Sequence, residues 1–149
     1  MKTSRASVKS SGRVVVDANP ILSAVIGGKA RTLFLTADVQ EFSTTIFTWN
    51  EVLTYLPAMS QKPKMRKAGV PLSDLYATLM ALPLVRYEYE FYQEKLNEAR
   101  RRIARRDPDD AHLLALVLKL KAPVWTNDED FADSGIEWFT TAEFLKRVF

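Results

Sequence analysis

The stretch RRDPDDAHLLALVLKLKAPVWTNDEDF, residues 105–131, decides how this chain folds. It begins and ends with acidic residues, and nearly everything between them is apolar. Asp107 followed by Pro108 is typical of a helix N-cap and the first helical residue, and the apolar run behind them predicts a buried helix. Residues 122–126 then predict a strand. We therefore expect a helix–strand unit with acids at both polar ends, and the sheet edge they share is where α/β proteins place their sites.

Outside this stretch, short β-rich runs alternate with helical patterns. The expected strands are residues 13–17, 42–47, 84–87, 122–126 and 136–139. The expected helices are residues 21–26, 30–37, 48–56, 71–82 and 88–104, one from residue 107, and one over residues 140–148, while the basic segment 61–69 fits a loop or a short helix. The RVVV run is apolar at successive positions, as in a strand buried on both faces. The sequence thus predicts an α/β fold whose mostly parallel sheet of four or five strands is covered on both faces.

Capping patterns predict where several helices begin and end. Asn19 precedes a proline and is expected to cap the first helix. Thr48 and Glu51 have the spacing of a capping box, and Pro57 is expected to end that helix near residue 56. Thr140 is expected to cap the last helix.

The composition is that of an ordinary globular protein, with 47% hydrophobic and 26% charged residues among 149. This length favours one domain over residues 13–149, preceded by a disordered basic tail over residues 1–12. The chain has no cysteine, which excludes disulfides and thiolate metal sites, and its net charge of +3 permits a nucleic-acid partner. No apolar run is long enough for a membrane span or a secretory signal, so we expect a cytoplasmic protein without a membrane partner.

Four acids are expected at one edge of the sheet. Asp17 and Asp128 follow predicted strands, and Glu51 and Asp110 lie at helix starts, which parallel strands bring to the same edge. Singly, each acid is explained as a helix cap worth about 1 kcal/mol. Together, the carboxylates would repel one another and raise their pKa values unless a cation lay among them. Oxygen ligands indicate Mg²⁺ or Mn²⁺, and hence hydrolysis of phosphodiester bonds.

The order VVVDAN, then TWNEVL, then DPDDAHLLALVLKLKAPVWTNDEDF resembles the PIN-domain nucleases, the group that includes the VapC toxins. The resemblance covers residue 13 to the C-terminus. It implies a three-layer α/β/α sandwich, divalent-metal-dependent RNA cleavage and frequent homodimers. It also implies a toxin role in which a small antitoxin protein blocks the site.

The resemblance assigns site residues one by one. Asp17, Glu51, Asp110 and Asp128 match the four family acids, which hold the metal and its activated water. Asp109 is an alternative to Asp110, and Asp130 an alternative to Asp128. Asn19 and Thr126 are expected to orient ligands or water.

Other residues carry weaker predictions. RNA binding is expected of two groups of basic side chains, one in the segment 61–69 and one just ahead of the acids at residues 107–110. They are Lys62, Lys64, Arg66, Lys67, Arg105 and Arg106. A solvated charge run is the alternative for each. His112, the one histidine, is expected on a helix surface or interface rather than as a proton carrier. Two other functions stay open: a PIN-like module that binds RNA or protein without cutting, and a phosphatase acting on a small phosphoester.

Overall fold

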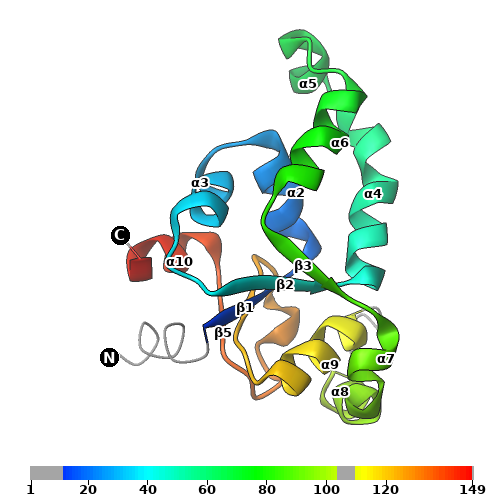
Figure 1. The fold of residues 1–149 in the computed structure, drawn as a ribbon, viewed down its shortest axis with the longest axis vertical. Helices are drawn as coiled ribbons and strands as arrows, with labels where there is room; N and C mark the ends of the chain where they lie inside the picture. The colour runs from blue at the N-terminus through cyan, green and yellow to red at the C-terminus, as the bar shows by residue number, and fades with distance from the viewer. Residues whose placement is uncertain (1–11, 104–109, 149) are drawn as a thin grey trace.

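The structure, a computed structural model, describes residues 12–103 and 110–148. Its centre is a sheet of strands in the order β3-β2-β1-β4-β5, and every pairing in this described part is parallel (Figure 1). The strands are β1 Arg13–Val16, β2 Glu41–Thr45, β3 Leu84–Tyr87, β4 Val124–Trp125 and β5 Trp138–Phe139. The predicted fold class, an α/β sandwich around a parallel sheet, is confirmed.

Helices cover both faces of the sheet. The α-helices are α2 Ala18–Ile26, α3 Lys29–Thr36, α4 Ile46–Ser60, α5 Pro63–Ala68, α6 Leu72–Ala81, α7 Tyr89–Tyr92, α8 Leu96–Arg102, α9 Asp110–Leu120 and α10 Thr141–Val148. Two short 3₁₀ helices are η1 Gln93–Lys95 and η2 Glu129–Phe131. No helix in the two described ranges is both long and apolar enough to cross a lipid bilayer.

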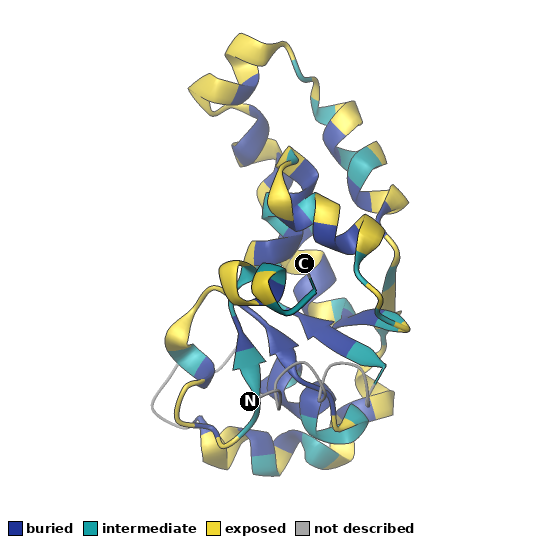
Figure 2. Ribbon diagram, turned by 90° about the vertical axis from the view of Figure 1, so that its left-hand side faces the viewer, coloured by how far each residue is buried: buried dark blue, intermediate teal, exposed yellow. Residues whose placement is uncertain are grey.

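The strands divide their side chains between two apolar cores, as the two-residue period of a strand requires. Val14 and Val16 face α2, α3, α4, α6 and α10, whereas Val15 faces α8 and α9. In β4, Trp125 joins the first core and Val124 the second. Strands β1, β2 and β4 are almost wholly buried, whereas the edge strand β3 is partly exposed; Figure 2 shows most of the sheet in the colour of buried residues. Burial on both faces explains why these strands are apolar at successive positions.

Three helices form an arm that extends away from the sheet. Helices α4 and α6 rise side by side, and α5 closes their far end (Figure 1). The tip is the most exposed part of the arm (Figure 2), and Met65 is the one residue of α5 that is buried. Of the two alternatives predicted for residues 61–69, a loop or a short helix, the structure has the short helix α5. Its basic side chains point to solvent.

Two predicted helix starts are wrong. The cap of helix α4 lies three residues earlier than expected: Thr45 caps the helix and accepts a hydrogen bond from the N–H of Thr48 (2.9 Å). Residues 46 and 47 are therefore helical rather than part of the second strand. Helix α2 is capped by Asp17 instead of Asn19, since the Asp17 carboxylate accepts from the N–H of Ala18 (2.7 Å).

Helix ends differ from prediction as well. Pro57 lies inside α4, which continues to Ser60. The expected helix over residues 88–104 is divided into α7, η1 and α8. The last helix is as predicted: Thr140 and Glu143 exchange side-chain to backbone hydrogen bonds of 3.2 and 2.9 Å, which is a capping box. The predicted cap at Asp107 and most of the basic tail lie outside the described residues.

Candidate functional site

The carboxyl ends of β1 and β4 meet at the point where the strand order reverses. From β1 the chain proceeds outward through β2 and β3, and it then returns to the other side of β1 with β4 and β5. Backbone bonds continue past the strand ends: the N–H of Asp17 donates to Trp125 and the N–H of Thr126 donates to Phe139, both at 3.0 Å. In open parallel sheets, ligands bind at this kind of switch point. The first acid of the predicted set stands directly on it.

Thr126 connects two of the predicted acids. Its side chain is fully buried, and its hydroxyl donates to Oδ2 of Asp17 (2.8 Å). The hydroxyl oxygen of Thr126 also accepts from the N–H of Asp128 (3.1 Å), and Oδ1 of Asp128 accepts from the N–H of Asp130 (3.2 Å). One hydroxyl thus orients Asp17 and holds the turn that carries the later acids. This geometry is compatible with the predicted role of Thr126, which is to orient ligands or water.

Burial and neighbouring negative charge raise the pKa values of Asp17 and Asp128. Burial raises the pKa of Asp17 most; hydrogen bonds from Thr126 and Ala18 lower it, and the charges of Asp128 and Asp130 raise it again. The net direction is upward. The pKa of Asp128 is also raised, by desolvation first and then by Asp130. Negative charge at the junction therefore costs free energy, and a bound cation would offset that cost.

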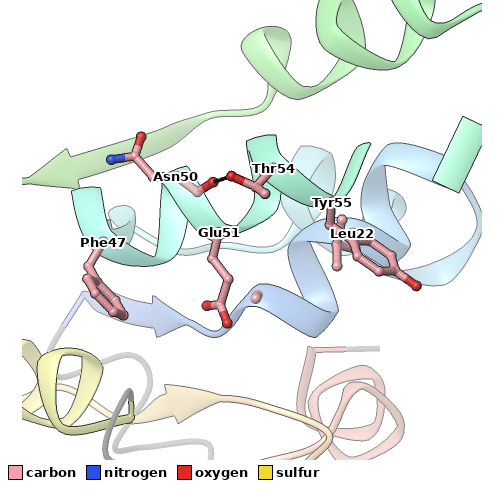
Figure 3. A pocket seen from close by; sticks show the side chains of 7 residues that line it. Leu22, Phe47, Asn50, Glu51, Thr54 and Tyr55 are labelled. Atoms are coloured by element: carbon pink, nitrogen blue, oxygen red, sulfur yellow. Dashed lines mark hydrogen bonds between the residues drawn. The ribbon is translucent and has the colours of Figure 1, made fainter. Parts of the chain in front are cut away.

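Glu51 projects from the second turn of α4 toward the junction of β1 and α2 (Figure 3). It lies on a cavity of about 510 Å³ whose other walls include Ala18, the residue that follows Asp17. Phe47 and Tyr55 lie one turn to either side of it on the same helix. Glu51 does not close the capping box predicted for it, so a structural explanation for this acid is lost.

Asp110 is the first described residue of α9, and it is partly buried. Two residues later, the ring of His112 stacks on Phe47, with 4.4 Å between centroids and 8° between planes. This contact brings the starts of α9 and α4 together, so Asp110 and Glu51 belong to the same region. His112 also lies 2.8 Å from the hydroxyl of Tyr92 through Nδ1. It is an interface side chain, as expected.

Asn19 takes part in a separate polar network. Its Oδ1 accepts from Nδ2 of Asn127 (3.1 Å), and Oδ1 of Asn127 accepts from the N–H of Thr141 (2.9 Å). The hydroxyl of Thr141 in turn accepts from the indole of Trp125 (2.9 Å). These bonds tie the loop after β4 to α2 and α10. In this structure Asn19 therefore steadies the rim of the site.

The donor chemistry of the site fits a hard divalent cation. All the candidate ligands are carboxylates, and those around Asp17 repel one another. Over residues 12–103 and 110–148, no three Asp, Glu or His side chains lie close enough together to coordinate one ion. The structure brings Asp17, Asp128 and Asp130 within electrostatic reach of each other and places Glu51 and Asp110 on adjoining helices.

The basic residues are separated from the acids. Lys62, Lys64, Arg66 and Lys67 lie at the tip of the arm, where all are exposed. Glu51 is two to three helical turns down α4 from that tip. Three other predicted residues, Asp109, Arg105 and Arg106, lie outside the described residues.

Three residues at the site, Asn127, Phe47 and Tyr55, were not predicted from the sequence. Asn127 was not singled out, although it stands between Thr126 and Asp128 and carries two of the hydrogen bonds at the rim. Phe47 and Tyr55 were also missed. Their signal was present, because residues at positions i, i+4 and i+8 of one helix share a face, and Glu51 lies between them.

Comparisons with known proteins give one family and several similar folds. A family model described as the PIN domain matches residues 15–147. A comparison with curated protein sequences gives no match.

Three solved structures have the same fold. A toxin–antitoxin complex from Klebsiella pneumoniae is 21% identical with a TM-score of 0.55, and the match covers 86% of this chain and 97% of that one. VapBC2 from Rickettsia felis, bound to a promoter DNA fragment, is 12% identical with a TM-score of 0.58, covering 86% and 98%. The Mycobacterium tuberculosis toxin VapC20, which cleaves the sarcin–ricin loop, is 14% identical with a TM-score of 0.54, covering 83% and 95%.

Proposed function

The chain belongs to the PIN-domain family, and from that premise we propose that it is a divalent-metal-dependent endoribonuclease. The observation that carries the proposal is the junction of β1 and β4. There a buried hydroxyl, Thr126, holds Asp17 in place, and burial first, then the charges of Asp128 and Asp130, raise the pKa of the Asp17 carboxyl group. Capping of α2 explains an acid at position 17, but it does not explain why further acids lie close enough to repel it. A bound cation would offset that repulsion.

The ligands would be carboxylates from four elements. Asp17, Glu51, Asp110 and Asp128 would hold Mg²⁺ or Mn²⁺, with Asp109 and Asp130 as alternatives to the last two. When bound, the cation supplies an activated water and neutralises charge on the phosphate oxygens. The protein's own part is to position these oxygens, chiefly through the hydrogen bonds of Thr126 to Asp17 and to the backbone of Asp128.

The substrate in this proposal is RNA, and the basic side chains bind its backbone. The exposed cluster at the tip of the arm, with Arg105 and Arg106 near the start of α9, would hold phosphates at a distance from the cleaved bond. The mildly basic net charge of +3 favours association with a polyanion.

A toxin role is the second part of the proposal. Two of the similar structures are described as toxin–antitoxin or VapBC assemblies, and a third as an RNA-cleaving toxin. By this analogy the chain is a cytoplasmic homodimer whose partner is a small antitoxin protein. A gene for such a partner beside this one, and its co-purification with this chain, would support this part.

The nuclease proposal is tested by metal binding and RNA cleavage in the same samples. Mn²⁺ is titrated by calorimetry into the wild type, Asp17→Asn and Asp110→Asn, and each is assayed on structured RNA and on a small phosphoester. Asp74→Asn serves as the control, since Asp74 is an exposed acid on α6. We expect saturable binding and RNA cleavage that the two site substitutions abolish and the control retains.

Two results would contradict it. A wild type that binds no Mn²⁺ and cuts no RNA would make the chain a PIN-like binding module, with its acids acting as helix caps. Turnover of the small phosphoester but not of RNA would favour the phosphatase.

A further inference from the structure

The cavity beside Glu51 has an aromatic and aliphatic wall. Phe47 and Tyr55 lie along α4 on either side of Glu51, and Leu22 of α2 lies near Tyr55 (Figure 3). The hydroxyl of Thr54 donates to the backbone carbonyl of Asn50 (2.8 Å), so this polar group is already used within the helix. The wall is therefore suited to a flat apolar surface.

Both rings are partly exposed to solvent at the edge of the cavity. Phe47 is 39% and Tyr55 40% accessible, although most large apolar side chains of the described residues are buried. The contact of Phe47 with His112 holds its ring in a defined orientation. Exposed aromatic rings held in place at the edge of a cavity are typical of sites that stack on another ring.

The size of the cavity favours a small planar group over a polypeptide. Its volume of about 510 Å³ is within the range of small-molecule sites, roughly 300–1,000 Å³. Seven residues of the described part of the chain line it, whereas a stable protein interface uses about 20–30 residues on each side.

A cation lies beside the same ring. Nζ of Lys62 is 5.5 Å from the centroid of Tyr55. Along α4, the acid Glu51, the ring of Tyr55 and the basic tip of the arm thus follow one another in order. This is the order that a single strand of nucleic acid requires: cleaved phosphate, neighbouring base, next phosphates.

We propose that this cavity is a nucleobase subsite, in which a base adjoining the cleaved phosphate stacks on Tyr55 and contacts Phe47. The proposal rests on the proposed ribonuclease function and adds that the enzyme binds its substrate as an unpaired strand. Single-stranded RNA is generally recognised through bases stacked on aromatic side chains. A duplex, whose bases are stacked on each other, cannot enter the cavity.

The test follows stacking and cleavage separately in one experiment. Short single-stranded RNAs of mixed sequence carry the fluorescent base 2-aminopurine at each internal position in turn. They are mixed with excess protein and Mn²⁺ in a stopped-flow instrument; rapid quenching reports stacking, and later gel samples report cleavage. The proteins are the wild type, Tyr55→Leu, Tyr55→Phe and Phe91→Leu. Phe91 is 38% exposed, lies outside the cavity and so is a matched control.

We expect rapid quenching at one RNA position in the wild type, in Tyr55→Phe and in Phe91→Leu. In Tyr55→Leu this quenching should be lost, and RNA affinity should fall by about 5- to 150-fold, as expected for one base–aromatic stack. Circular dichroism of Tyr55→Leu would verify that it is folded.

The outcomes separate the two proposals. If Tyr55→Leu quenches and binds as the wild type does while RNA is cut, the subsite is wrong and the ribonuclease stands; the cavity would then be open to a polypeptide partner. If quenching depends on Tyr55 but the wild type cuts nothing, base binding stands and the ribonuclease is wrong. A wild type that quenches at no position overturns the subsite.

Discussion

The junction of β1 and β4 and the arm of α4, α5 and α6 are built in opposite ways. At the junction, the polar side chains lie against the sheet and are held by hydrogen bonds, such as those of Thr126 with Asp17 and Asp128. At the tip of the arm, the polar side chains are all exposed, and Met65 is the one buried anchor of α5.

The junction is built to hold atoms in fixed positions, whereas the tip is built to attract charge over a distance. A buried hydroxyl between a carboxylate and a backbone N–H positions both groups closely, and it must be hydrogen-bonded, because an unpaired buried polar group is costly. Exposed lysines on a short helix position nothing closely, but they attract a polyanion over a distance. Changes at the junction should therefore affect folding and chemistry together, whereas changes at the tip should affect binding alone.

The largest expected effect is on unfolding free energy, and it should differ between the core under the sheet and the core of the arm. Leu114 is fully buried beneath β1 and β4, and Leu114→Ala should cost about 2–5 kcal/mol of unfolding free energy. Met65→Ala should cost less than about 1 kcal/mol globally, because six-residue α5 can open without the sheet. Urea denaturation measures both, and hydrogen exchange of Met65→Ala should change only near α5. Equal global losses would mean that arm and sheet unfold as one unit.

The next effect concerns the hydroxyl at the junction. Thr126→Val keeps the shape of the side chain but removes the donor to Asp17 and the acceptor for the N–H of Asp128. We expect a loss of about 1–3 kcal/mol in unfolding free energy and a fall of about 10- to 100-fold in RNA cleavage. Thr126→Ser retains the hydroxyl and should recover most of both. Failure of serine to recover cleavage would assign the role to the methyl group instead.

A smaller effect is expected from removing a charge at the junction. The folded state raises the pKa of Asp17, so it binds a proton more tightly than the unfolded chain, and the associated stability is lost as pH rises through the folded pKa. Asp17→Asn should therefore be more stable than the wild type at pH 7 in EDTA. The advantage should shrink toward acid pH and vanish below the unfolded pKa of about 3.9. Urea denaturation across this pH range measures it; a less stable Asp17→Asn at pH 7 would contradict the argument.

The smallest effect on stability belongs to the tip of the arm. Replacing Lys64 and Arg66 by Gln should change unfolding free energy by less than about 0.5 kcal/mol. If both side chains contact phosphates, the slope of log affinity against log salt should fall by about 1.4 for single-stranded RNA. Lys29→Gln, an exposed lysine on α3, should leave the slope unchanged. An unaltered slope in the double variant would place RNA elsewhere.

The sequence predicted the architecture because burial leaves a strong pattern. Strands covered on both faces are usually apolar at successive positions, as the three valines of β1 and the Val-Trp pair of β4 are. The same pattern located Asp17 and Asp128 at strand ends, and parallel pairing brought them to one edge. What the pattern cannot supply is the hydrogen bond between Thr126 and Asp17, because it joins residues 109 positions apart.

Helix boundaries were harder because two caps competed. Both Thr45 and Thr48 can cap a helix, and only Thr48 has the glutamate three positions later that a capping box requires, so local chemistry favours Thr48. Tertiary packing favours Thr45: β2 stays paired with β3 as far as Thr45 and Tyr87, and Trp49 and Val52 then face the core. Pro57 was expected to end α4, yet it lies near the last turn, where the helix tolerates the loss of one hydrogen bond.

The central position of β1 has a consequence for the living cell. Its neighbour β4 is synthesised much later, because Thr126 follows Asp17 by 109 residues. At 5–20 residues per second, Thr126 is added about 5–20 s after Asp17. Until then the growing polypeptide carries its first acid without the partner that orients it. The proposed site is therefore incomplete during most of synthesis, and it can form only when the chain is nearly finished.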